Sequence, residues 1–363
     1  MANVDPTSIM YTPMLKGKDG ELGALGVASL KTRAAMLPVL DVAPVPWDFK
    51  NDRPAKTLDQ HLEKLPRRLQ KYWGPGQRFG LDFMHISDGK RLKDGTHPLE
   101  AVVERCRAAS LDVVPVVGPD RDAAFYEAAR AACARSRHGA ALRIPRDRFH
   151  EPSLFSELLQ ETGLQAQECD LILDLRDVAQ DDVQRAAMDA LGALQSLPGA
   201  MRWRTVTVAA SGFPHDLSKV KKNSKGSFPR TALAIWKRLR ELGSELPRVP
   251  LYGDYGITHP DLSEMDPRTM KMSANIRYTR ANEFLVVKGN LVKPHGYRQM
   301  YDLCRRLVDT VEDFDPSLSW GDDFIAACAR NEGSTGNATT WRKLGTSHHF
   351  AVVVPQIASL LAA

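Results

Sequence analysis

Short apolar runs recur along the chain, and most are separated from the next by a stretch with helical periodicity. Between the runs, apolar residues recur every three to four positions, as in LDQHLEKLPRRLQKYW and PRTALAIWKRLRELG. Such stretches are long enough to return the chain to a parallel neighbouring strand. The pattern therefore predicts βα units. Eight runs have the composition of buried strands, and they span residues 35–44, 78–86, 111–118, 139–145, 169–178, 204–214, 248–256 and 282–290.

Eight such units predict a (β/α)₈ barrel of the TIM type, with an open doubly wound sheet as the alternative. No predicted strand is followed by the GxGxxG turn of a dinucleotide-binding sheet. The nearest match, GKDGELGALG at 17–26, precedes the first predicted strand and has the composition of a helix start. We expect one elaborated α/β barrel over residues 1–363, with an N-terminal helix and a C-terminal helical extension.

Charge and cysteine content limit the class of protein. The 363 residues include 49 Lys or Arg and 44 Asp or Glu, a net charge of +5 that does not require a polyanionic partner. The opening MANVDPTSIM lacks a basic region followed by an apolar stretch, and the longest apolar run, 350–363, is too short to span a bilayer. The five cysteines have no CxxC spacing. We expect a cytoplasmic protein with reduced, structural cysteines and no membrane association.

Charged residues interrupt the ends of the predicted strands, which is where TIM-barrel active sites are built. Burying a charge is costly unless it is paired, so these residues need an explanation. One explanation is structural, with the acids pairing with Arg143 and Lys288 across the barrel mouth. The other is a pocket in which charges of both signs bind a ligand. The strand-end residues are Asp41, Asp82, His85, Arg143, Asp174, Asp254, Tyr255 and Lys288.

The chemistry of this set allows several roles. Asp82, Asp174 and Asp254 are candidates for catalytic acid or base groups, and Arg143 and Lys288 are candidates for holding an anion. No HxH, HExxH or DxDxDG spacing occurs, so we expect no metal or cofactor. The alternative is an Mg²⁺ site assembled from separate strands, with ligands among Asp41, Asp82, His85, Asp174 and Asp254. Ser211 lacks the GxSxG context of a nucleophile and is interpreted as a turn residue.

One segment is strongly basic. Residues 202–248 contain eleven Lys or Arg and three Asp or Glu, and the part at 211–230 is predicted to be a long loop. Its lysines could neutralise nucleic-acid phosphates, although few aromatic residues accompany them. The alternative is an ordinary solvated surface. The lysines concerned are Lys219, Lys221, Lys222 and Lys225.

Several ordered blocks resemble the beta protein family, which is named after a phage T4 type beta protein and is found in phages and bacterial accessory genomes. The blocks are YTPMLKGKDGELGALG, LPVLDVAP, YGDYGITHP, MSANIRYTRANEFLVVKGN, LSWGDDFI and WRKLGTSHHFAVVV. The resemblance implies a phage or phage-defence context and no particular reaction. It adds Asn275, Arg277 and His349 to the candidate ligand-binding residues. Because His348 and His349 are adjacent, at most one is expected to face a site.

Three hypotheses follow from the sequence. The first is a barrel that binds a small anionic or nucleotide-like ligand at its C-terminal mouth, with or without catalysis. The second is a non-catalytic scaffold that binds a partner protein in a phage-defence system, since a fold does not fix a function. The third is a nucleic-acid contact through the basic loop at 211–230.

Overall fold

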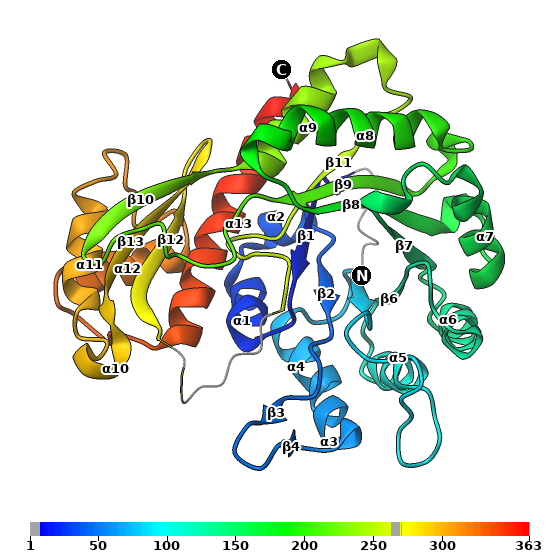
Figure 1. Ribbon diagram of the computed structural model, residues 1–363, viewed down its shortest axis with the longest axis horizontal. Helices are drawn as coiled ribbons and strands as arrows, with labels where there is room; N and C mark the ends of the chain where they lie inside the picture. Colours follow the sequence, from blue (N-terminus) through cyan, green and yellow to red (C-terminus); the bar gives the residue numbers. More distant parts are fainter. Residues whose placement is uncertain (1–7, 263–268, 270, 363) are drawn as a thin grey trace.

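The computed structural model describes residues 8–262, 269 and 271–362, and its centre is a closed barrel of eight parallel strands (Figure 1). The barrel order is β1-β11-β9-β8-β7-β6-β5-β2. The ring closes where β1 pairs with β11 on one side, with Tyr11 opposite Tyr252, and with β2 on the other. The barrel strands are β1 (Tyr11–Leu15), β2 (Val39–Asp41), β5 (Phe79–Asp82), β6 (Val113–Val117), β7 (Ala140–Pro145), β8 (Cys169–Asp177), β9 (Thr205–Ser211) and β11 (Leu251–Asp254).

The predicted closed barrel is confirmed, and the alternative of an open sheet is not. The first and the last strand of the predicted barrel differ from those in the structure. Seven of the eight predicted runs contain barrel strands. The eighth, 282–290, is wrong as a barrel strand, because it forms β13 (Glu283–Leu291) in a separate antiparallel sheet. The missing barrel strand is β1, a five-residue segment that includes Pro13. An apolar run does not reveal whether its partners are parallel or antiparallel, which is why β13 was misassigned.

Helices surround the barrel, and several begin at residues that cap a helix N-terminus. Thr57 forms a capping box with Gln60 at the start of α3, and the Asp122 carboxylate accepts a hydrogen bond of 2.7 Å from the Phe125 amide in α6. The helices that follow the barrel strands from β1 to β9 along the chain are α1 (Asp19–Val27), α2 (Leu30–Ala34), α3 (Leu58–Glu63), α4 (Leu65–Tyr72), α5 (Pro98–Ala108), α6 (Ala123–Ser136), α7 (Pro152–Thr162), α8 (Val183–Ser196) and α9 (Thr231–Glu241).

A second hydrophobic core lies beside the barrel. Its sheet has the order β10-β13-β12, with β10 (Ser224–Pro229) and β12 (Ser273–Thr279) both antiparallel to β13. The predicted loop at 211–230 therefore ends in a strand. The helices that follow β13, at 292–329, pack on this sheet. They are α10 (Val292–His295), α11 (Met300–Val308) and α12 (Trp320–Ala329).

The long terminal helix α13 (Ala338–Ala362) joins the two cores, and Figure 1 shows it running between them. Trp341 and Leu344, near its start, belong to the core around β12 and β13. Phe350 and Ile357, further along, belong to the barrel core. Consequently α13 places its polar residues between the barrel mouth and the second sheet.

Two further sequence predictions can be compared with the fold. All five cysteines are free and buried, in accord with a structural role. Among the described residues, no helix combines the length and apolar character needed to cross a membrane.

Candidate functional site

Arg143 lies at the centre of a buried network at the barrel mouth. Its Nη1 donates to Asp41 Oδ1 at 2.9 Å and to Asp82 Oδ2 at 2.8 Å. Its Nε donates to Asp174 Oδ2 at 2.9 Å, and its Nη2 donates to the Tyr255 hydroxyl at 2.7 Å. The Tyr255 hydroxyl in turn donates to Asp174 at 2.6 Å. The structure thus brings together five of the residues singled out at the strand ends.

The donors of this guanidinium are occupied by protein acceptors. Burial alone would lower the pKa of Arg143, but Tyr255, Asp41 and Asp174 raise it well above its ordinary value. Burial raises the pKa of Asp82 above its ordinary value, and Arg143 opposes the shift. For Asp41, burial is outweighed by Arg143, and the pKa is lowered. We interpret Arg143 as the structural partner of the three carboxylates, the first of the two explanations offered by the sequence.

The same geometry bears on the Mg²⁺ alternative. The Arg143 guanidinium occupies the position between Asp41, Asp82 and Asp174 that a shared cation would take. Within residues 8–262, 269 and 271–362, no group of three or more His, Cys, Asp or Glu side chains is arranged to hold a metal ion. The donor set therefore does not fit Mg²⁺ at this place.

Asp254 forms a separate buried cluster at the end of β11. It accepts hydrogen bonds of 2.6 Å from the Tyr11 and Tyr252 hydroxyls and 2.9 Å from the Gly256 amide. His349 Nε2 lies 3.0 Å from its Oδ2. Burial would raise the pKa of Asp254, but His349 and the tyrosine hydroxyls lower it to about 2. Asp254 is therefore a charged carboxylate held inside the fold.

The adjacent histidines on α13 point to different partners, as their spacing predicts. His349 Nδ1 lies 2.8 Å from Thr279 Oγ1, which connects the Asp254 cluster to β12. His348 Nδ1 lies 3.0 Å from Asp322 Oδ2, and its ring stacks on Tyr278 at 3.7 Å between centroids. Both imidazoles are buried and engaged with protein groups, so α13 is fixed to β11, β12 and α12 through them.

His85 is placed differently, at the rim of the mouth. Its Nε2 lies 3.7 Å from Asp41 Oδ2, which is beyond hydrogen-bond distance. The side chain lines a cavity of about 550 Å³ beneath the small hairpin β3 (Trp47–Asp48) and β4 (Arg53–Pro54). Apolar residues such as Val45, Leu58 and Ile86 line this cavity together with the cations Arg53, Lys56 and Lys90.

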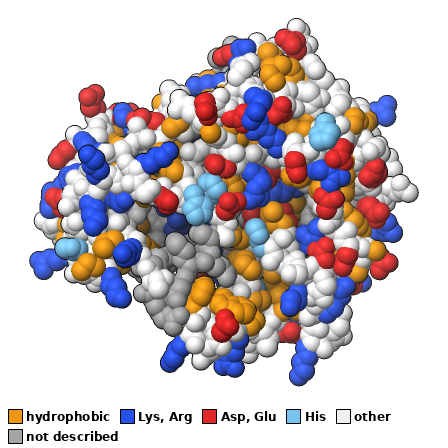
Figure 2. Space-filling view, in the orientation of Figure 1, with side chains coloured by type: hydrophobic (Ala, Val, Ile, Leu, Met, Phe, Trp, Pro, Cys, Tyr) orange, Lys and Arg blue, Asp and Glu red, His pale blue; other side chains and the backbone are white. Residues whose placement is uncertain are grey.

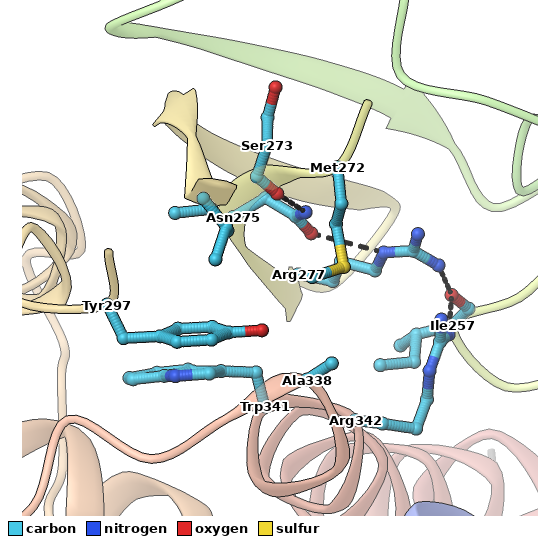
Figure 3. Close-up of a pocket in the computed structure, with 11 residues that line it drawn as sticks. Ile257, Met272, Ser273, Asn275, Arg277, Tyr297, Ala338, Trp341 and Arg342 are labelled. Carbon is cyan, nitrogen blue, oxygen red and sulfur yellow. Dashed lines mark hydrogen bonds between the residues drawn. The ribbon is translucent and has the colours of Figure 1, made fainter. Parts of the chain in front are cut away.

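Arg277 and Asn275, on β12, line a different pocket beside the mouth (Figure 3). Arg277 Nη1 donates to the carbonyl oxygen of Ile257 at 2.7 Å, and Arg342 Nη1, from α13, donates to the same oxygen at 3.3 Å. Figure 3 shows both guanidinium groups converging there, with Tyr297 and Trp341 on the opposite side of the pocket. The two arginines thus come from separate elements and share one acceptor.

The electrostatics of this arginine pair are unusual. Burial and the neighbouring Arg342 lower the pKa of Arg277 well below its ordinary value, and burial also lowers the pKa of Arg342. Among the described residues neither guanidinium has a carboxylate at ion-pair distance. Glu21 is near enough to oppose both shifts, but its Oε2 accepts from the Lys16 amide at 2.8 Å, and burial raises its pKa. Positive charge on the pair is therefore opposed in part by the buried Glu21.

Lys16 extends the positive charge toward the barrel. It follows β1, and its Nζ donates to the carbonyl oxygen of Asp261. Burial lowers the pKa of Lys16 to about 8, with Lys18 and Arg342 acting in the same direction and Glu21 against it. Lys16 follows β1, Arg277 lies on β12 and Arg342 lies on α13, so three separate elements contribute these cations.

Lys288 does not lie at the barrel mouth, because β13 is not a barrel strand. Its Nζ donates to the carbonyl oxygens of Leu217 and Val220 at 2.6 and 2.8 Å. The predicted pairing of Lys288 with the strand-end acids is therefore wrong. Its bonds instead fasten the segment before β10 to the antiparallel sheet.

The lysines of the basic segment are exposed. Lys219, Lys221 and Lys222 precede β10, whereas Lys225 lies within it and donates to Thr310 Oγ1 at 3.0 Å. Figure 2 shows acidic and basic side chains interspersed over one face of the molecule. The proposed nucleic-acid contact of these lysines stays a prediction.

Arg342 is the functional candidate that reasoning from strand ends did not find. It lies in the first turns of α13 rather than after a strand, so position alone gave no reason to select it. The available indication was its place in the WRKLGTSHHFAVVV block, next to Trp341.

Similar proteins were found among family models and among solved structures. A family model described as Beta protein matches residues 11–355. A search of the curated proteins found no match. Among solved structures, triosephosphate isomerase from Bartonella henselae is similar, with 12% identity and a TM-score of 0.32 over 56% of this chain and 83% of that one. The barrel assignment itself rests on the strand order described above.

Proposed function

The chain belongs to the Beta protein family, and we propose that it binds a small molecule through an anionic group, a phosphate, held between Arg277 and Arg342. The observation that carries the proposal is the convergence of two guanidinium groups on the single carbonyl oxygen of Ile257. Like charges at this distance repel, and burial strengthens the repulsion. A bound anion would supply the missing negative charge.

The chemistry of the pocket supports a phosphate. Guanidinium groups present N–H donors in a fork that matches phosphate oxygens, and two of them can grip one group from separate directions. The pocket volume of about 130 Å³ suits one such group rather than a whole nucleotide. Asn275, whose Oδ1 lies 3.4 Å from Arg277 Nε, adds an amide to the same wall.

The remainder of the ligand would lie against aromatic and apolar side chains. Tyr297 and Trp341 face the arginines across the pocket, and Met272 and Val292 complete its apolar lining (Figure 3). Aromatic faces accept planar rings as well as aliphatic groups. A nucleotide-like molecule matches this arrangement, with its phosphate at the two arginines and its ring system against the aromatic side chains.

The experiment is titration calorimetry of the full chain with inorganic phosphate and with AMP. Arg277→Gln and Arg342→Gln each remove one charge and keep a hydrogen-bonding group, and we expect each to weaken binding at least tenfold. Arg280→Gln is the matched control, since Arg280 is exposed and pairs with Glu283 just beyond β12. Equal affinity in all four proteins would reject the proposal.

A second candidate site for a small anion is the cavity beside His85. The observation favouring it is that Arg53, Lys56 and Lys90 gather around an apolar cavity of about 550 Å³ at the barrel mouth. No reaction is proposed for either site, and acid or base roles for Asp82, Asp174 and Asp254 stay predictions. A phage-defence context, with or without a partner protein, likewise stays a prediction from the family.

A further inference from the structure

A cavity of about 380 Å³ lies at the amino-terminal end of the barrel, opposite the mouth. The residues just before β5, β6, β7 and β9 line it, since Arg78, Asp112, His138 and Arg204 each precede one of these strands. Arg33, from α2, and Arg137, at the end of α6, complete its charged wall. Charged residues at this end of a TIM barrel are not needed for the catalytic chemistry of the fold, which takes place at the other end.

The charges around this cavity are not balanced. Four arginines and His138 face Asp112, and the buried Asp170 beneath them pairs with Arg204 at 2.6 Å and with Arg78 at 3.4 Å. His138 lies 3.4 Å from Asp112. Two carboxylates therefore face four guanidinium groups and one imidazole, so the cavity has an excess of positive charge.

Hydrogen bonding is also incomplete here. Arg78 Nη2 and Arg33 Nε are buried and have no hydrogen-bond acceptor among the described residues, and Gln77 Oε1 has no donor. Arg33 donates through its Nη2 to the Trp73 carbonyl oxygen, and its guanidinium lies over the Trp73 ring. Native proteins leave few buried donors unpaired, so unpaired guanidinium nitrogens beside a cavity indicate a missing acceptor.

Arg137 provides an independent observation. It ends α6 with a φ of 57°, in the left-handed region, at the position after a helix where glycine is favoured. The backbone would therefore accept glycine more readily than arginine. The side chain that stands there instead contributes its charge to the cavity.

We propose that this cavity is a further anion site, which binds the phosphate group of a small molecule through Arg33, Arg78 and Arg137. The site is separate from the Arg277 and Arg342 pair and does not depend on it. Guanidinium forks from three directions match the oxygens of one phosphate, and the larger volume leaves room for the rest of the molecule.

Arg137→Gly is the informative variant, because it removes the charge while giving the backbone its preferred residue. Its unfolding temperature should equal or exceed that of the wild type. In titration calorimetry of the full chain with inorganic phosphate, we expect two sites in the wild type, one in Arg137→Gly and one in Arg342→Gln. Arg330→Gln, which changes an exposed arginine on the second core, should retain both.

The outcomes separate the two anion sites. One site in the wild type that is lost in Arg137→Gly and kept in Arg342→Gln would support this inference and reject the proposed function. Phosphate binding in Arg137→Gly with the same stoichiometry and affinity as in the wild type would overturn the inference. Arg78→Gln serves as a second test and should weaken the same site at least tenfold.

Discussion

His349 on α13 lies against Asp254 at the end of β11, with its Nε2 3.0 Å from Oδ2 and 3.2 Å from Oδ1. Burial lowers the pKa of His349 even though Asp254 opposes the shift, so the ring is neutral at neutral pH. A neutral ring that donates from Nε2 to Asp254 accepts at Nδ1 from the Thr279 hydroxyl. This pair ties the terminal helix to the barrel.

The first prediction concerns the pH dependence of stability. The folded-state pKa of His349 lies below the ordinary 6.5 of the unfolded chain. The unfolded chain therefore binds the proton first, and the free energy of unfolding falls as the pH drops below 6.5. Asp254, with a pKa of about 2 against 3.8, loses its contribution only in stronger acid. In His349→Gln, the slope of unfolding free energy between pH 7 and 5 should decrease by up to about 1.4 kcal/mol per pH unit. Urea unfolding at several pH values measures this.

The control for that experiment is His150→Gln, which changes an exposed histidine. We also expect His349→Gln to lower stability at pH 7 by about 1–3 kcal/mol, because it disturbs a buried hydrogen-bonded carboxylate. An unchanged pH slope in His349→Gln would show that His349 binds protons equally in the folded and unfolded states, which would contradict a lowered pKa in the folded protein.

The second prediction concerns Arg143. Replacing it with methionine leaves Asp41, Asp82 and Asp174 buried without their shared cation, at an expected cost of about 3–5 kcal/mol. Arg143 lowers the pKa values of Asp41 and Asp82 in the folded state. Without the guanidinium these two pKa values rise, so the loss should be smaller at pH 5 than at pH 8. Urea denaturation at both pH values measures the difference.

Arg146→Met is the comparison, since Arg146 pairs with Asp182 and Asp189 near the surface. Such pairs contribute about 0–1 kcal/mol. Similar stability losses for the two variants would contradict the structural role assigned to Arg143.

The third prediction concerns the packing that brings Arg277 and Arg342 together. A Cβ atom at Gly345 would lie 2.8 Å from the Arg277 carbonyl oxygen and 2.6 Å from Ile257 Cδ1. Gly345→Ala should therefore push α13 away from β12, lower stability by about 1–3 kcal/mol and weaken phosphate binding. Thermal unfolding and calorimetry test both effects.

Gly192→Ala is the control, because a Cβ there meets nothing within 4 Å and the site is inside α8. Alanine at such a position is expected to stabilise the helix by about 1 kcal/mol. Full phosphate affinity in Gly345→Ala would mean that the arginine site does not depend on this close approach.

The fourth prediction belongs to the nucleic-acid alternative. If the exposed Lys221 and Lys222 contact phosphates, their joint replacement by glutamate should reduce retention on DNA and RNA and lower its salt dependence. Filter binding at two or more salt concentrations measures this. Unchanged retention in the double variant would reject the alternative.

The barrel could be predicted from the sequence because seven of its strands are apolar runs followed by helical segments. β1 was missed because YTPML is short and contains a proline. The predicted number of eight barrel strands was right because the run 282–290, which forms β13, was counted in place of β1. The pairing of β13 with β10 joins positions 54 to 64 residues apart, from Pro229 with Glu283 to Ser224 with Lys288, which a local pattern does not encode. Its pairing with β12 is a local hairpin, in which Thr279 lies opposite Phe284.

The site was predictable only in part. Positions at strand ends correctly brought together Asp41, Asp82, Arg143 and Asp174, since parallel strands end at one edge. The same reasoning could not show that the N–H groups of Arg143 donate to acceptors within the protein. Nor could it select Arg342, because the register of a helix packed between two cores determines which of its residues meets Arg277.

The most direct test of the central claim is a crystal structure of the full chain grown with tungstate, a phosphate analogue with strong anomalous scattering. If Arg277 and Arg342 bind phosphate, an anomalous peak will lie in the pocket of Figure 3, within hydrogen-bond distance of both residues. A peak elsewhere on the molecule together with an empty pocket at these two residues would contradict it.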